Sequence, residues 1–394
     1  MLRSKKASGQ IEFCVPCNWD ERLLKFLNNY AVHSLYGKLK YDEIGGGRPA
    51  CNLSEVTEEF AARYIKKARS FGLNFNYLLN ASCIGNKEFT KSGYRSIIDR
   101  LSWLEEMGVN YITVSIPYLG EIIRTRFPQF KIAVSKLAFV SSAQKAKYWE
   151  DIGADQIVLD INIIRDFKKL EQIRDCVGID LVLLVNDACL FDCPYAHYHA
   201  NLNSHASQTD YSGTYVNYCR FFCAHKFLEN PIEIVKSMFI RPEDLHFYED
   251  IGITRFKITD RIRPTHWIVN VLDAYSRRSY NGNLADLLGP HSSYGKNEDL
   301  RIVNPWEIGN FEELEEMRKT DLFRPNVYID NKKLEGFLDF FRTGNCETRH
   351  CDECKHCEEY TNRAVSIDGT KKDIILKNLK AVLDWLKTGD REEN

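Results

Sequence analysis

Residues 148–161 read YWEDIGADQIVLDI, which combines the end of an amphipathic helix, a glycine and a short strand rich in β-branched residues. A glycine at this place commonly takes the left-handed conformation that ends an α-helix. The strand is almost continuously apolar, as is typical of a parallel sheet that is covered on both faces. The stretch therefore predicts one helix-to-strand unit of an α/β fold.

The same pattern occurs four more times along the chain, in KKARSFGLNFNYLLN (66–80), LSWLEEMGVNYITVSI (101–116), IRDCVGIDLVLLVN (173–186) and FYEDIGITRFKIT (247–259). The glycines that we expect to be left-handed are Gly72, Gly108, Gly153, Gly178 and Gly252. Three further strands are expected at 11–15, 32–36 and 131–135, and a helix is expected from Pro264. Eight strands that mostly alternate with helices predict a TIM-like (β/α)8 barrel. An open doubly wound sheet shares this alternation and is the alternative, although no GxGxxG motif follows the first strand.

The chain is expected to divide into two parts. Residues 1–280 would form the barrel, with a cysteine-rich loop at 186–240. Residues 281–394 would form a C-terminal extension that is cysteine-rich and partly helical. It begins with an extended region rich in Gly, Asn and Pro (281–330) and closes with an amphipathic helix, DIILKNLKAVLDWLK (373–387).

The bulk composition limits the classes of partner. The formal net charge is −2, from 53 Lys and Arg against 55 Asp and Glu, so a nucleic-acid partner is not favoured. No apolar run approaches the length of a membrane span, and the first residues lack the apolar core of a secretory signal. We therefore expect a cytoplasmic protein without a membrane partner. Disulfides are disfavoured there, so the 13 cysteines indicate metal or redox chemistry.

The longest polar stretch is NDACLFDCPYAHYHANLNSHASQTDYSGTYVNYCRFFC (186–223), directly after a predicted strand. Long loops in compact domains are usually functional, and the loops that follow barrel strands form the active site. It contains two C-x3-C pairs, Cys189 with Cys193 and Cys219 with Cys223. Four thiolates predict a soft-metal site, either an iron–sulfur cluster or zinc. The alternative is a loop of solvated histidines and free thiols.

Histidines and cations near this loop are candidate catalytic residues. His197, His199 and His205 could ligate a metal or move protons. On an extended segment His197 and His199 would face the same way. Three cations, Lys257, Arg241 and Arg261, are expected to anchor an anionic substrate. For Arg241 the alternative is an ion pair with the acidic residues that follow it.

A second cysteine set lies in the extension, with the spacing C-x4-C-x2-C-x2-C: Cys346, Cys351, Cys354 and Cys357. Four thiolates within 12 residues strongly indicate a metal site. The compact single run favours an iron–sulfur cluster, and zinc is the alternative. The chain is thus expected to bind one or two [4Fe-4S] clusters. The second set could serve only as a structural staple or an electron relay.

The segment FIRPEDLHFYEDIGITRFKITDR (239–261), placed after a cysteine-bearing loop, resembles the peptidase U32 family. Asn80, Ser135 and the run Gly153–Leu159 belong to the same resemblance, which extends over residues 10–280. It implies a barrel-like fold and a [4Fe-4S] cluster held by four cysteines. The better-understood members are similar to oxygen-independent hydroxylation proteins that act on ubiquinone precursors or RNA bases, with prephenate implicated as oxygen donor. Collagenase-type peptidase activity is ascribed to others.

The sequence therefore predicts an enzyme with hydroxylase-like redox or Lewis-acid chemistry on a small or nucleic-acid-derived substrate. Its partners would be a small-molecule or modified-substrate ligand and a second subunit of the same family. One alternative is a zinc- or cysteine-dependent peptidase, although neither G-x-S-x-G nor H-E-x-x-H occurs. The other is a non-catalytic partner subunit with structural clusters.

Overall fold

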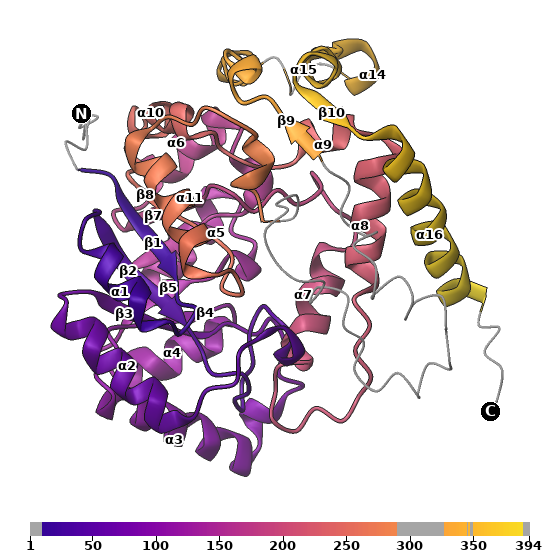
Figure 1. Ribbon diagram of the computed structural model, residues 1–394. Coiled ribbons are helices and arrows are strands. Elements are labelled where there is room, and N and C mark those ends of the chain that lie inside the picture. Colours follow the sequence, from indigo (N-terminus) through magenta and orange to yellow (C-terminus); the bar gives the residue numbers. More distant parts are fainter. Residues whose placement is uncertain (1–9, 290–326, 345, 347–349, 389–394) are drawn as a thin grey trace.

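A computed structural model describes residues 10–289, 327–344, 346 and 350–388 (Figure 1). Eight parallel strands close into a barrel, each paired with its neighbours in chain order and the last with the first. The strands are β1 (Glu12–Pro16), β2 (Val32–Gly37), β3 (Asn74–Leu79), β4 (Tyr111–Val114), β5 (Lys131–Val134), β6 (Gln156–Val158), β7 (Asp180–Leu184) and β8 (Arg255–Lys257). The predicted barrel is confirmed, and the alternative of an open sheet is wrong.

Helices on the outside of the barrel connect these strands. They are α1 (Glu21–Leu27), α2 (Glu58–Ser70), α3 (Lys91–Glu106), α4 (Pro117–Arg126), α5 (Ala143–Asp151), α6 (Phe167–Cys176), α10 (His246–Glu249) and, after β8, α11 (Thr265–Arg277). Hydroxyl and carboxylate side chains cap several helix starts, as Thr57 does for α2, Thr90 for α3 and Asp166 for α6. The helix expected from Pro264 is α11, for which Pro264 is the N-cap. No helix within the described residues is long and apolar enough to cross a membrane.

Four of the five glycines expected to be left-handed have positive φ, between 74° and 92°. Gly178 is the exception, and that prediction is wrong. Helix α6 ends at Cys176, and the next residue, Val177, is already extended. The Arg174 guanidinium donates to the carbonyls of Val177 and Ile179, at 2.5 and 2.9 Å. A side chain thus satisfies the carbonyls of this turn, and no left-handed residue is needed.

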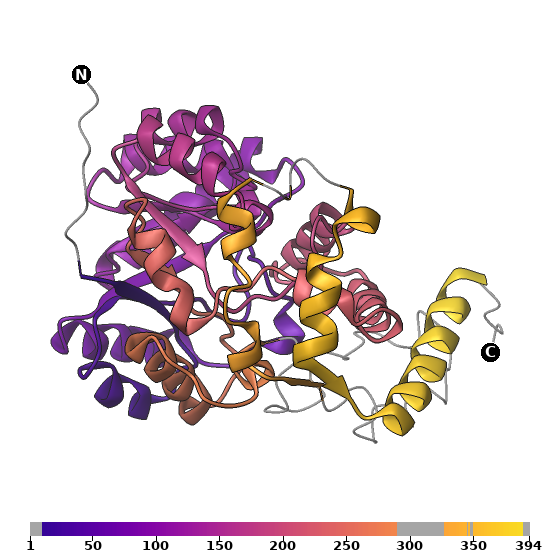
Figure 2. The same cartoon turned by 90° about the horizontal axis from the view of Figure 1, so that it is seen from above.

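A helical insertion separates β7 from β8. It contains α7 (Ala196–His205), α8 (Tyr218–Glu229) and α9 (Ile232–Lys236). The loop predicted at 186–240 therefore contains all ten residues of α7 and all twelve of α8. Both helices lie beside the barrel rather than around it (Figures 1 and 2).

The described part of the extension is also packed on the protein. It contains β9 (Val327–Ile329), α13 (Asp339–Arg342), α14 (Cys351–Cys354), α15 (His356–Ala364), β10 (Val365–Ile367) and α16 (Gly369–Thr388). Strands β9 and β10 pair antiparallel. Helix α16 confirms the predicted terminal helix and runs alongside α8 (Figure 1). The central part of the predicted extended region, 290–326, lies outside the described residues.

The apolar core continues from the barrel into the extension. Phe337, Leu338 and Phe341 belong to the same buried cluster as the barrel side chains that face the helices. A smaller cluster fills the inside of the ring: Cys14, Tyr36, Leu78, Val158, Val182 and Leu184. A third buried cluster joins α8 to α16 through Phe221, Leu228, Ile375, Leu379, Val382 and Leu383. The extension therefore contributes to the stability of the helix that carries Cys219 and Cys223.

An ion network lies at the amino ends of the strands, opposite the cysteine insertion. Arg255 binds Glu12 at 2.8 Å and also pairs with Asp180. The buried His33 lies beside this network, with Nδ1 3.5 Å from Glu12. Burial and the nearby Arg255 lower the pKa of His33 to about 4. The folded chain therefore keeps this imidazole neutral in mild acid, whereas the unfolded chain protonates it.

His33 should make the barrel sensitive to acid. When a histidine has a lower pKa in the folded state than in the unfolded state, the protein loses stability as pH falls below the unfolded pKa of about 6.5. We predict that wild type loses on the order of 1–2 kcal/mol of unfolding free energy between about pH 7 and about pH 5 through this group. In the His33→Gln variant this contribution is absent. Its unfolding free energy, measured by urea unfolding at the two pH values, should therefore fall by that much less than the unfolding free energy of wild type. His266→Gln, an exposed position on α11, is the control, and an equal loss in wild type and His33→Gln would contradict the assignment.

A candidate cluster site at the mouth of the barrel

The carboxyl ends of the strands open into a cavity of about 300 Å³. Its walls come from the ends of β2, β3 and β5 to β8, from the loop at 47–49 and from the inserted helices α7 and α8. A closed parallel barrel brings all these segments to one rim, because every strand ends there. The cavity therefore collects side chains from positions 36 to 289 of the chain.

The glycines of the loop after β2 allow it to lie against α7. Gly45 has φ of +83°, and an added Cβ would stand 2.6 Å from the carbonyl oxygen of Ser204. The Gly46 amide donates to Ser207 Oγ at 2.7 Å. A Cβ on Gly46 would lie 2.9 Å from Asn80 Oδ1. Larger residues could not approach this closely, and the close approach places the next side chain, Arg48, at the cavity.

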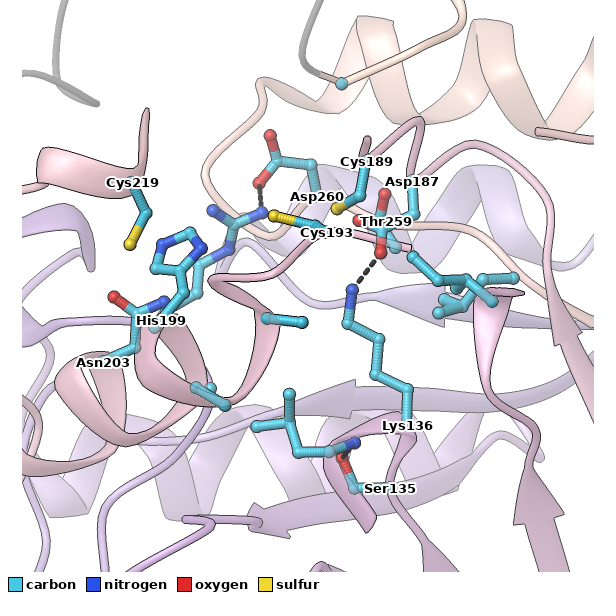
Figure 3. Close-up of a pocket in the computed structure, with 18 of the residues that line it drawn as sticks. Ser135, Lys136, Asp187, Cys189, Cys193, His199, Asn203, Cys219, Thr259 and Asp260 are labelled. Carbon is cyan, nitrogen blue, oxygen red and sulfur yellow. Dashed lines mark hydrogen bonds and ion pairs between the residues drawn. The ribbon is translucent and has the colours of Figure 1, made fainter. Parts of the chain in front are cut away.

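All four cysteines of the insertion line this one cavity: Cys189, Cys193, Cys219 and Cys223. Cys219 and Cys223 are four residues apart on α8 and share one face of that helix. Cys189 and Cys193 precede α7, and in Figure 3 they point into the same space as Cys219. The structure thus brings together the two pairs that the sequence separates by 25 residues.

The backbone before each of the first two cysteines is left-handed without being glycine. Ala188 has φ of 44° and Asp192 has φ of 45°. Such a conformation costs about 1–3 kcal/mol and is kept where the surroundings hold it, often at functional sites. The Asp192 amide donates to Asn162 Oδ1 at 3.0 Å, which fixes the turn that presents Cys193. Both turns aim a thiol at the cavity.

The surroundings of the thiols are cationic. Burial raises the pKa of Cys189 and Cys219 to about 12, and neighbouring cysteines add to the effect. Lys136 opposes the rise at Cys189 by favouring its charged form, and Arg220 Nη1 lies 3.8 Å from Cys223 Sγ. Positive groups near sulfur stabilise thiolate ligands of a metal centre.

The donor set fits a cluster better than a single ion. Among the described residues, no three His, Cys, Asp or Glu side chains stand close enough together to bind one metal ion. A four-iron cubane is wider than one ion and holds its cysteine ligands further apart. Four cysteines around one cavity of this size are compatible with that wider spacing.

The three candidate histidines are separated by the structure. They lie on α7, so the expectation of an extended segment is wrong. On a helix, residues two apart point to different sides. His199 lines the cavity, where burial and the cations Lys136 and Arg48 lower its pKa to about 4. His197 instead packs its ring 4.0 Å from the Phe139 ring, and His205 ends α7; neither lines the cavity.

Two of the three candidate cations enter the cavity without a carboxylate partner. Lys257 is enclosed at the end of β8, with Nζ 4.1 Å from the centre of the Tyr36 ring, and burial lowers its pKa to about 8. Arg261 is also buried, and burial together with Arg48 lowers its pKa to about 10. Neither side chain forms an ion pair with a carboxylate in the part of the chain that the structure describes.

Two further cations of the cavity, Arg48 and Lys136, are already paired. Arg48 Nη2 lies 2.6 Å from Asp260 Oδ1, and Arg263 Nε lies 3.0 Å from Asp260 Oδ2. Lys136 pairs with Asp187, as Figure 3 shows. Lys257 and Arg261 are therefore the cations best placed to receive an anionic ligand.

Arg241 lies outside the cavity. It is buried with Glu243 and Asp244, at 3.5 and 3.4 Å, which matches the ion-pair alternative for this residue. Burial raises the pKa of Asp244 to about 6, although Arg241 opposes the shift. The contacts of Arg241 thus indicate a role in holding the fold rather than in binding a ligand at the cavity.

Several cavity residues were not among the predicted site residues: Arg48, Lys136, Asp187, Asn203 and Arg220. Lys136 and Asp187 each follow closely on the end of a barrel strand, where the rule for strand ends places side chains at the mouth, although neither was predicted as a ligand or catalytic residue. Arg48 follows three glycines, and its pairing with Asp260 depends on ring closure. Asn203 and Arg220 lie on helices that had been expected to be a loop.

Comparisons with known proteins find similarity in sequence and in fold. The sequence model of peptidase family U32 matches residues 40–282. An uncharacterized protease of Methanocaldococcus jannaschii, MJ1657, is 30% identical over 324 residues, which cover 82% of this chain and 86% of that protein. The tRNA hydroxylation protein P of Escherichia coli is 24% identical over 285 residues, which cover 70% of this chain and 57% of that protein. The solved structure of the U32 peptidase Mk0906 has a TM-score of 0.50 at 22% identity, covering 65% of this chain and 95% of that one.

The packing of α16 on α8 should hold Cys219 and Cys223 in place. Leu379 on α16 is fully buried against α8. Leu379→Ala should weaken this contact by about 2–3 kcal/mol through cavity formation. We predict that amide hydrogen exchange in α8 then becomes about 30- to 100-fold faster, since local opening is that much easier. Leu379→Met keeps the volume and is the control. Faster exchange confined to α16 would contradict the prediction.

Proposed function

Because the chain belongs to peptidase family U32, we propose that its barrel mouth holds a [4Fe-4S] cluster and supports oxygen-independent hydroxylation of a small or nucleic-acid-derived substrate. One observation carries the proposal. Four cysteines from two segments line the same cavity as two cations that lack carboxylate partners, Lys257 and Arg261. The first group suits a metal cluster and the second suits an anionic reactant.

The cluster ligands in this proposal are Cys189, Cys193, Cys219 and Cys223. A bound cluster would supply one-electron or Lewis-acid chemistry at a low reduction potential. The chain itself tunes the setting of the sulfurs. Arg220 donates towards Cys223, and the turn at Asp192 orients Cys193.

Lys257 and Arg261 would bind the carboxylate of an oxygen donor. Charge-assisted hydrogen bonds from a guanidinium orient a carboxylate, and a buried site strengthens them. In the overall exchange, a C–H bond of the substrate becomes C–OH while a C–OH bond of the donor becomes C–H. Atoms and electrons then balance between the two reactants, and no dioxygen is needed.

The remaining polar residues hold this arrangement. Asp260 fixes Arg48 and Arg263 on its two oxygens, so those cations do not compete for the anion. Asn186 stabilises the mouth, because it bonds the backbone of Thr259 at 2.8 Å and the carbonyl of Leu287 at 3.0 Å. His199 would offer a neutral imidazole that can accept a proton within the cavity.

Two substrate classes are to be distinguished. The E. coli relative is named as a tRNA hydroxylation protein, which supports a tRNA base as substrate. The formal net charge of −2 does not favour a polyanionic partner and so favours a small molecule. Anaerobic incubation with prephenate and either bulk tRNA or a mixture of small aromatic acids, followed by mass spectrometry for one added oxygen atom, separates the two.

Metal binding is tested by anaerobic reconstitution with iron and sulfide. We predict a broad charge-transfer absorbance and about four iron atoms bound at the mouth. Replacing Cys219 and Cys223 by alanine should abolish that absorbance component, because two of the four ligands are lost. Cys176→Ala is the matched control, since Cys176 is exposed on α6. Charge-transfer absorbance equal to that of wild type in the double variant would contradict the proposed site. Circular dichroism reports whether the variant is folded.

Anion binding is tested with prephenate as the probe. Arg261→Gln should weaken its binding by about 10- to 100-fold, the usual effect of losing one charge-assisted hydrogen bond in a buried site. Lys257→Met should act in the same direction. Arg277→Gln, an exposed arginine on α11, is the control. Unchanged affinity in both cavity variants, measured by isothermal titration calorimetry, would contradict the assigned roles.

The peptidase alternative predicts a different outcome. The M. jannaschii relative is named a protease, and a cysteine peptidase needs a thiol activated by a nearby base. Within the described residues, none of the four cavity cysteines hydrogen-bonds a histidine. Peptide cleavage in air by iron-free protein would favour that alternative and reject the proposal.

A further inference from the structure

The second cysteine set lies on a different part of the molecule from the barrel mouth. It lies beyond residues 40–282, which match the family model, and so needs its own explanation. Cys354 and Cys357 are half-buried around the turn between α14 and α15. Lys355, between them, is left-handed with φ of 54°. Cys346 and Cys354 both interact electrostatically with Cys357.

A buried arginine stands beside these thiols. Arg165, between β6 and α6, is 6% exposed and forms no ion pair with a carboxylate in the described part of the chain. Of the ionisable groups around it, Cys357 interacts with it most strongly, and Cys346 is also near. Burying a cation without a counter-charge is costly. The thiols are thus placed to supply that charge.

The known contacts of Arg165 do not account for all of its hydrogen-bonding groups. Its Nη1 and Nη2 cap the end of α9, donating to the carbonyls of Val235, Lys236 and Ser237 at 2.6–3.2 Å. The rings of Phe337 and Phe341 lie 4.8 and 5.5 Å from the guanidinium. Nε is buried and has no hydrogen-bond partner. A neutral thiol is a weak acceptor, whereas a metal-bound thiolate accepts such a bond well.

The aromatic side chains next to the thiols fix this segment on the barrel. The His356 ring is stacked between Phe337 and Phe340, with centroids at 5.1 and 4.2 Å. His356 Nε2 lies 3.0 Å from the carbonyl oxygen of Phe337. Cys357, the next residue, is thereby held against Arg165. Lys236, at the end of α9, adds a second positive charge near it.

We propose that the extension carries a second metal centre, a four-thiolate site for which Arg165 is the buried counter-cation. Its ligands are Cys346, Cys351, Cys354 and Cys357. A cluster bound by four thiolates keeps a net negative charge, which Arg165 and Lys236 offset, and its width suits thiols that, among the described residues, are not close enough together to bind a single ion. The centre is closed, with protein ligands only, and its role is structural. It fastens α15 to α9 and, through β10 and α16, steadies α8.

The test is metal analysis of the full chain purified without oxygen, with iron, sulfide and zinc measured together. Cys351 is exposed, so Cys351→Ala should not unfold the protein by loss of burial. We expect this variant and Cys354→Ser to lose one metal centre while the barrel-mouth signal remains. Loss of iron with sulfide identifies a cluster, whereas loss of zinc without iron would reject the cluster in favour of a single ion. Metal content equal to wild type in both variants would overturn the proposal, whatever the outcome at the barrel mouth.

The role of Arg165 has a separate readout. Arg165→Met keeps most of the volume but removes the charge. We expect the extension to release its metal to a chelator about tenfold faster than wild type, the effect of one lost charge-assisted hydrogen bond. Arg363→Met is the matched control, because Arg363 also stacks on an aromatic ring, Tyr360, but is exposed. Equal release rates in wild type and Arg165→Met would reject the counter-cation.

Discussion

Closure of eight parallel strands into a ring is the constraint on which the site depends. It brings the carboxyl end of every strand to one rim, so side chains far apart in the sequence share one cavity. The connection from β7 to β8 must also begin at that rim and return to the other end of the barrel. Its two longest helices, α7 and α8, stay beside the mouth, where their cysteines and His199 face the ends of the other strands.

The second constraint on the structure is the burial of positively charged side chains. Arg261 at the mouth and Arg165 beneath the extension are buried, and Lys257 lines the mouth; none of the three pairs with a carboxylate among the described residues. The buried Arg263, by contrast, is paired with Asp260. An unpaired buried cation destabilises a fold unless a ligand or a thiolate centre offsets it. Lys257 and Arg261 line the cavity that also contains the first cysteine set, and Arg165 interacts with Cys357 and Cys346 of the second set.

Much of this architecture could be predicted from local pattern. The order helix, glycine and apolar strand recurs because every repeat forms the same helix-on-strand packing unit. Four of the five glycines end their helices as expected. Gly178 differs because the side chain of Arg174 does the capping. Helices α7 and α8 were missed because their apolar residues do not recur at helical spacing. Packing against α16, about 150 residues later, stabilises α8 instead. The pairing of Arg48 with Asp260 and the approach of Arg165 to Cys357 are likewise non-local, and no sequence spacing announces them.

The central claim is that Cys189, Cys193, Cys219 and Cys223 surround inorganic iron at the barrel mouth. The most direct measurement is a crystal structure of the anaerobically reconstituted protein, with anomalous diffraction recorded at the iron edge. We expect one compact iron peak inside the cavity, within bonding distance of all four sulfurs. Iron bound elsewhere, or no anomalous signal between these four cysteines in protein shown to be folded, would contradict it.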